Sequence, residues 1–148
     1  MNEHGYFKLA SSQNVIFLWV KGPGNQETFD RYNAEFNALI EKEGYKNYAV
    51  LVMLGGENIM TPEVFASFQN ILSARIDNGV KTIALFITDS NGTSITQQQV
   101  SKLYQATPDF NVQFFYSFDE AKQWLESFGF VVEHQAWQAF VKTLPLHL

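Results

Sequence analysis

The chain of 148 residues contains no cysteine and little histidine. The absence of cysteine excludes disulfides, thiolate nucleophiles and cysteine-ligated metal sites. The histidines, His4, His134 and His147, stand too far apart to show the spacing of a metal site. We therefore expect no metal and no cofactor.

Positive charge and long apolar runs are also scarce. Lys and Arg number 10 against 15 acidic residues, for a formal net charge of −5. Nucleic-acid binding requires clustered basic side chains, so we expect no nucleic-acid partner. No apolar run approaches the ~20 residues of a membrane-spanning helix, and the first residues lack the pattern of a secretory signal. We expect a single cytoplasmic domain over residues 1–148.

The chain instead alternates short apolar runs with amphipathic segments. Two runs rich in aromatic and β-branched residues, 6–10 and 15–21, predict a β-hairpin. In the second run Phe17 and Trp19 point to one face and Leu18 to the other, so both faces of this strand require cover. Further strands are predicted at 48–54, 82–88 and 112–116.

Helices are expected after these strands, because apolar residues there recur at intervals of three and four. Asn25, Thr61 and Ser117 are the expected N-caps, and Gly44 and Gly79 the expected ends of the first two helices. A short helix is expected after Thr96, and a C-terminal helix has its apolar stripe at Trp137, Phe140, Val141 and Leu144. Because parallel strands need crossover connections, the order predicts an α/β fold with a five-stranded, mixed but mostly parallel sheet and flanking helices.

The alternation closes on Phe114-Phe115-Tyr116, which enters Ser117-Phe118-Asp119-Glu120-Ala121 and then Trp124-Leu125. This stretch resembles the last strand and helix of STAS, SpoIIAA-like domains. The order and spacing of the elements extend the resemblance over residues 6–128. It implies a SpoIIAA-like core, to which residues 130–148 add a C-terminal helical extension.

The resemblance also directs attention to the turn after the third strand. Anti-sigma antagonists of that family carry a phosphorylatable serine there, in an Asp-Ser-Ser-Gly-like sequence. This chain has Gly55-Gly56-Glu57-Asn58 and no serine before Thr61, whose expected role is to cap the next helix. Asp89-Ser90-Asn91-Gly92 is closer to the motif, but it follows the fourth strand and consists of common turn residues.

The first hypothesis for function is therefore a non-enzymatic, STAS-like binding or regulatory module without the phosphoserine turn. Ligands of open α/β sheets usually sit at the loops that follow the strands. A protein partner or a small ligand is expected there. The candidate binding residues are Gly55, Gly56, Glu57, Asn58, Thr61, Asp89, Ser90 and Asn91. Gly22-Pro23-Gly24 lacks the Lys-Ser or Lys-Thr pair of a phosphate loop and is interpreted as a turn.

The second hypothesis rests on the aromatic residues, which make up 16% of the chain. Those on predicted apolar faces are Phe29, Phe36, Phe65, Phe68, Phe114, Trp124, Phe128 and Trp137. They provide either an ordinary packed core or the lining of a cavity. A cavity would suit a carrier of a small apolar ligand or lipid that contacts membranes peripherally, with the C-terminal helix as its cover. That helix is otherwise a core element or a dimer contact, so both a monomer and a homodimer remain open.

An enzyme is the third hypothesis. Asp89 and Asp119 follow neighbouring strands and can approach one another. A carboxylate pair without a base, a metal or an oxyanion donor defines no mechanism. We therefore expect no catalytic residue.

Overall fold

The computed structural model describes residues 6–22, 25–55, 61–87, 98–99, 101–102 and 111–145. These residues form a five-stranded sheet in the order β1-β2-β3-β4-β5. The strands are β1 (Tyr6–Ser12), β2 (Val15–Lys21), β3 (Tyr48–Gly55), β4 (Val80–Ile87) and β5 (Asn111–Phe115). β1 pairs antiparallel with β2, and the other neighbours pair in parallel. The predicted mixed, mostly parallel sheet is confirmed.

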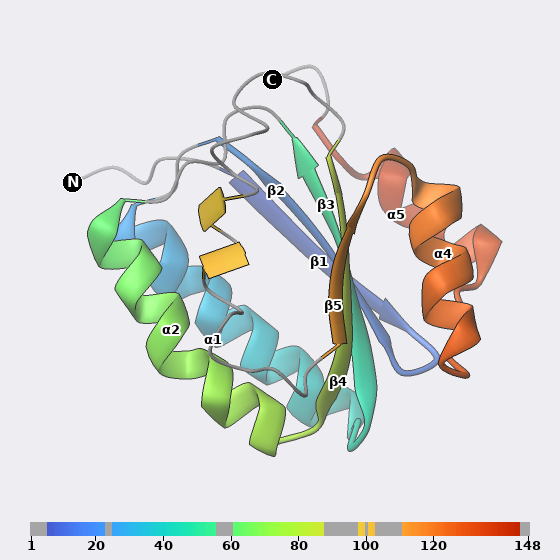
Figure 1. Ribbon diagram of the computed structural model, residues 1–148, viewed down its shortest axis with the longest axis horizontal. Coiled ribbons are helices and arrows are strands. Elements are labelled where there is room, and N and C mark those ends of the chain that lie inside the picture. The colour runs from blue at the N-terminus through green and yellow to red at the C-terminus, as the bar shows by residue number, and fades with distance from the viewer. Residues whose placement is uncertain are drawn as a thin grey trace.

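Helices cover both faces of the sheet, as Figure 1 shows. One face packs against α1 (Gln26–Glu43) and α2 (Pro62–Asp77), and the other against α4 (Phe118–Ser127) and α5 (His134–Lys142). Residues 98–99 and 101–102, within the expected short helix, are also helical. The sheet thus separates two hydrophobic cores.

The alternation of side chains along β2 assigns its residues to these two cores. Ile16 and Leu18 pack under α1 and α2, whereas Phe17 and Trp19 pack under α4 and α5. All four side chains are buried. β2 lies between β1 and β3, so the expectation that this strand needs cover on both faces is confirmed.

The three predicted helix starts are also confirmed. The side-chain oxygens of Asn25, Thr61 and Ser117 each accept a hydrogen bond from the backbone N–H three residues further on, at 3.0, 3.2 and 3.3 Å. These bonds satisfy donors that a helix start leaves without an intrahelical partner. Gly44 ends α1 with a φ of 69°, the left-handed conformation that its position predicts.

β2 has the predicted bounds, and the other strands differ from the prediction by one or two residues at one or both ends. β4 begins at Val80 instead of Thr82, because Val80 pairs with Tyr48 across an irregularity in the β3–β4 ladder. The exposed Lys81 interrupts the apolar run and hides this extension in the sequence. β5 covers 111–115 instead of 112–116.

The predicted aromatic faces are mostly inside the molecule. Phe29, Phe36 and Trp137 are buried. Phe65, Phe68, Phe114 and Trp124 are partly buried. The prediction is wrong for Phe128, which is 45% exposed because it caps the carboxyl end of α4 beyond the packed face.

The C-terminal helix α5 packs on its own domain. Trp137 stacks on Phe118 of α4 with ring centroids 4.7 Å apart, and it meets Phe17 of β2 edge to face at 5.2 Å. Phe140 and Leu144 are buried in the same core. Of the open alternatives for this helix, the structure shows the core element. Within the described ranges, no helix is both long and apolar enough to cross a membrane.

Candidate functional site

The first candidate site is the carboxyl edge, the edge of the sheet at which the parallel strands end. Gly55 is the last residue of β3, is buried, and is in register with Lys21 at the end of β2. Thr61 is exposed and begins α2 at the same edge. The other candidate binding residues, Gly56, Glu57, Asn58, Asp89, Ser90 and Asn91, lie outside the described residues.

The amino ends of α1 and α2 are held together at the carboxyl edge. The Ser67 hydroxyl of α2 lies 3.1 Å from Gln26 Oε1 of α1 and 3.1 Å from the carbonyl oxygen of Glu63, and either oxygen can accept its one proton. Gln26 Nε2 in turn donates to Asp30 Oδ1 at 2.9 Å. Helix amino ends carry partial positive charge, and Glu27 and Glu63 in the first turns complement it. The two helix starts therefore lie in contact at this edge, each with an acidic residue in its first turn.

Among the described residues of the carboxyl edge, Thr61 and Ser117 use their hydroxyl groups as helix caps. Thr61 Oγ1 accepts from Val64 N, which confirms its expected role. Ser117 Oγ accepts from Glu120 N and also contacts Glu120 Oε1, both at 3.3 Å. Tyr116, just before this cap, is 79% exposed. Helix capping therefore explains why Thr61 and Ser117 stand at these positions. It does not explain the exposed aromatic side chain of Tyr116.

A polar cluster between α1 and α2 was not anticipated from the sequence. Arg75 Nη1 donates to Tyr32 Oη at 2.6 Å, and Nη2 donates to Asn33 Oδ1 at 2.7 Å. The guanidinium lies 4.0 Å from the ring centroid of Phe36. Burial raises the pKa of Tyr48, and the Arg75 charge acts in the opposite direction. The cluster ties the two helices together inside the fold.

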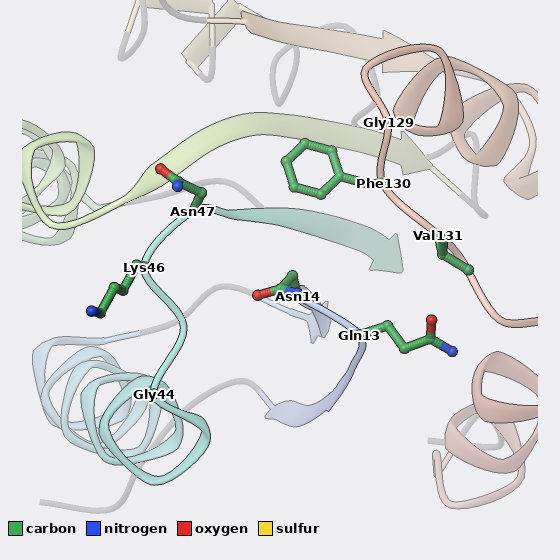
Figure 2. Close-up of a pocket in the computed structure, with 8 residues that line it drawn as sticks. All are labelled: Gln13, Asn14, Gly44, Lys46, Asn47, Gly129, Phe130 and Val131. Atoms are coloured by element: carbon green, nitrogen blue, oxygen red, sulfur yellow. The ribbon is translucent and has the colours of Figure 1, made fainter.

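The opposite, amino edge of the sheet carries a pocket of about 550 Å³ that is open to solvent (Figure 2). It is lined by Gln13, Asn14, Gly44, Lys46, Asn47, Gly129, Phe130 and Val131. These residues come from three connections: the β1–β2 turn, the segment between α1 and β3, and the segment between α4 and α5. We call this space the amino-edge cavity.

Left-handed backbone shapes each of the three connections. Gln13 and Asn14 have φ angles of 48° and 66°, and Gly44 and Gly129 have 69° and 92°. The sequence indicates the polar turn and the cap at Gly44. It does not indicate that these places meet, because each signal is local and the residues are far apart in the chain. The cavity is therefore a second feature, after the Arg75 cluster, that the sequence does not predict.

No protein-family model and no curated protein matches the sequence. Among solved structures, the chain is similar to an uncharacterized protein from the DUF3478 family, with a SpoIIAA-like fold, from Shewanella loihica PV-4. The TM-score is 0.55 at 14% identity, and the match covers 84% of this chain and 96% of the other. Likeness at this identity concerns the fold alone. The chain thus has the SpoIIAA-like α/β fold that the sequence resemblance implies.

Proposed function

We propose that this protein is a non-enzymatic binding or regulatory module that holds a protein partner or a small ligand at its carboxyl edge. The observation that carries the proposal is the contact between Ser67 and Gln26, which fixes the amino ends of α1 and α2 side by side. Loops that leave the parallel strands at this edge start from a rigid support. A support of this kind presents a binding loop at little entropic cost.

The proposed module works without the serine switch of anti-sigma antagonists. The turn after β3 begins Gly55-Gly56-Glu57-Asn58, which contains no hydroxyl group. The nearest hydroxyl, that of Thr61, accepts the capping hydrogen bond of α2. Recognition would therefore depend on backbone groups and on the Glu57 and Asn58 side chains.

The carrier of an apolar ligand or lipid receives less support. Its expected cover, α5, is packed into a core through Trp137 and Phe140. The amino-edge cavity is bordered by amide side chains, glycines and a lysine, with Phe130 and Val131 as its apolar side chains. A lipid chain would need a larger apolar surface.

The proposal is tested with two variants at the carboxyl-edge loops, Asn58→Ala and Asp89→Ala. Each is expected to leave the free energy of unfolding within about 0.5 kcal/mol of the parent, as for most surface substitutions. Each is expected to lower partner capture by about tenfold, which corresponds to ~1.4 kcal/mol. Capture is quantified by mass spectrometry after affinity purification. A native mass spectrum of the freshly purified protein reports any retained small ligand.

The matched control is Lys46→Gln, which removes an exposed charge at the opposite edge. It is expected to leave capture unchanged. Equal capture by the parent and both loop variants would contradict the proposed site. A loss of capture in all three variants would instead show that the effect is not specific to the carboxyl edge.

A further inference from the structure

The amino-edge cavity lies where two helices end. Gly44 directly follows α1 and Gly129 closely follows α4, and both glycines line the cavity. The last turn of a helix carries partial negative charge. At α4 the N–H groups of Gly129 and Phe130 bond the last carbonyls, and at α1 the N–H group of Gly44 bonds the Ile40 carbonyl, so the helix ends act here through this partial charge. Two such helix ends at the same cavity favour a positively charged occupant over a negative one.

The side chains around the cavity offer acceptors and an aromatic face. Asn14 and Asn47 contribute amide oxygens that accept N–H donors. Figure 2 shows the Phe130 ring pointing from its backbone toward the side on which Asn47 lies. Aromatic faces attract ammonium groups within roughly 6 Å. Amide acceptors and an aromatic ring in the lining of one pocket match the chemistry of a protonated amine.

A carboxylate stands beside this lining. Gln13 Nε2 donates to Glu133 Oε2 at 2.7 Å and so joins the β1–β2 turn to the start of α5. The charge of Lys46 opposes that of Glu133, but Figure 2 shows the Lys46 side chain directed away from the other lining residues. Because Lys46 is exposed, its ammonium group can stay hydrated while the cavity is occupied.

The rim of the cavity is held in place before any ligand arrives. Ala49 N donates to Asn14 O at 3.0 Å, and Tyr48 N donates to Gly79 O at 3.0 Å. Gly79 approaches the Lys46 carbonyl so closely that a Cβ atom at position 79 would lie 2.0 Å from the oxygen. A preformed rim reduces the ordering cost of binding.

The β1–β2 turn lacks the residue pair that most favours a two-residue hairpin turn. Gln13 and Asn14 occupy two consecutive left-handed positions, where Asn-Gly is the favoured pair. Non-glycine residues in such conformations store strain, which persists where other interactions hold it. At this turn both residues place amide side chains at the cavity, which a glycine would not do.

We propose that the amino-edge cavity is a binding site for a protonated alkyl amine. The helix ends supply partial negative charge to the ammonium group, the amide side chains of the lining offer acceptors for its N–H donors, and the Phe130 ring supplies the aromatic face that attracts it. The pocket is open to solvent, and its volume of about 550 Å³ can admit a small alkyl amine. This site lies at the edge opposite the proposed carboxyl-edge site, and the amine proposal does not depend on the function proposed there.

The test compares three probes of similar length and different charge: putrescine, 1,4-butanediol and succinate. Two-dimensional NMR of the labelled full chain follows the backbone amides of residues 13–14, 44–47 and 129–131 at pH 7. Putrescine is expected to shift these signals to saturation, whereas butanediol and succinate are not. Absence of saturation at tens of millimolar putrescine, or equal shifts with butanediol, would overturn the proposal.

Variants that change the charge of the rim test the sign of the ligand's charge. Lys46→Gln and Asn47→Asp both make the exposed rim more negative, and each is expected to tighten putrescine binding about twofold to fivefold, as for charges near a protein surface. Weaker or unchanged binding in both variants would overturn the assignment of a cationic ligand. These exposed positions keep the test informative even if a variant inside the cavity folds poorly.

Two aromatic variants provide a matched pair. Phe130→Leu removes the aromatic face of the lining, and it is expected to weaken putrescine binding about threefold to fivefold. Phe128→Leu changes an exposed aromatic residue outside the lining and is expected to bind as the parent does. Equal affinity of the two variants would show that Phe130 does not contact the amine.

Discussion

At the residue scale, Arg75 is held by neutral groups. Its two terminal nitrogens donate to Tyr32 and Asn33, its Cζ lies over the Phe36 ring at 4.0 Å from the centroid, and its Nε is buried without a hydrogen-bond partner. A planar guanidinium can make two directed hydrogen bonds and stack at the same time, whereas an ammonium group cannot. The identity of the cation, and not only its charge, therefore matters at this position.

We expect Arg75→Lys to lower the free energy of unfolding by about 1–3 kcal/mol, because at least one of the two acceptors loses its donor. Urea denaturation measures the change. The contrasting variant is Glu35→Gln, which breaks the Arg31–Glu35 pair at 3.7 Å, where both side chains are more than half exposed. It should cost no more than about 0.5 kcal/mol. Equal losses of unfolding free energy in the two variants would show that the Arg75 cluster stabilises the fold no more than an exposed ion pair does.

The raised pKa of Tyr48 leads us to expect a loss of stability at alkaline pH. Burial raises its pKa above the ordinary value of 10.0, so the folded protein retains the phenol proton at a pH where the unfolded chain releases it. This contribution is complete below pH 10 and disappears as the pH rises from 10 to the pKa of the folded state. In urea titrations between pH 8 and 11, Tyr48→Phe should lose less stability than the parent. Parallel curves for the two proteins would contradict this.

At the scale of elements, the junction between α2 and β4 depends on one glycine. Gly79 has a φ of 125°, and a Cβ atom there would lie 2.0 Å from the carbonyl oxygen of Lys46. We expect Gly79→Ala to cost about 3 kcal/mol or more, from backbone strain and displacement of the connection before β3. Thermal and urea unfolding measure the loss.

Gly44→Ala is the matched control for Gly79→Ala. Gly44 also has a positive φ, 69°, but a Cβ atom at position 44 would meet nothing within 4 Å. Its substitution should cost only the left-handed penalty, about 1–2 kcal/mol. If the two variants lose the same free energy of unfolding, the contact with the Lys46 carbonyl adds nothing to the loss. The left-handed backbone conformation alone would then explain it.

Local signals explain which elements could be predicted from the sequence. Asn25, Thr61 and Ser117 act through a bond to an amide three residues away, so their cap roles are visible in the sequence. The start of β4 depends on pairing between Val80 and the distant Tyr48, which no short pattern contains. The same reasoning explains Phe128: its spacing fits the apolar stripe, but the helix ends before that position is covered.

The two candidate sites also differ in how far the sequence predicts them. The carboxyl edge follows from the order of strands, because all loops after parallel strands leave the sheet together. The amino-edge cavity requires three separate connections to converge, and Gln13, Lys46 and Phe130 carry no mutual signal in the sequence. Its lining becomes visible only when the connections are placed in space.

At the scale of the whole molecule, the sheet divides the interior into two cores that are closed differently. α1 and α2 close one core and are joined through Ser67 and Arg75. The other core is closed by α4 together with α5, which follows the region of SpoIIAA-like resemblance. Phe17, at the middle of β2, contacts the rings of Trp137 and Phe140 on α5. The C-terminal helix thus completes a core that the preceding elements leave open.

Removal of residues 131–148 should therefore abolish the cooperative unfolding transition. The truncated chain would expose Phe17 and Phe86, which pack against Trp137 with ring centroids 5.2 and 5.9 Å apart. Loss of Trp137 alone is comparable to core truncations that cost about 3–5 kcal/mol, a large share of the ~5–15 kcal/mol that stabilises a domain. Urea denaturation, near-ultraviolet circular dichroism and binding of a hydrophobic dye measure the effect.

The truncation also separates the core role of α5 from a cover over a ligand. A core element predicts dye binding, a lost near-ultraviolet signal and a broad urea transition in the truncated chain, with Trp137→Leu intermediate because it retains part of the apolar contact. A cover predicts a truncated chain that keeps its sharp transition and releases a bound apolar compound, detectable in native mass spectra of the two proteins. Since Trp137 stacks directly on Phe118 of α4, the first outcome is expected, and the second would restore the carrier hypothesis.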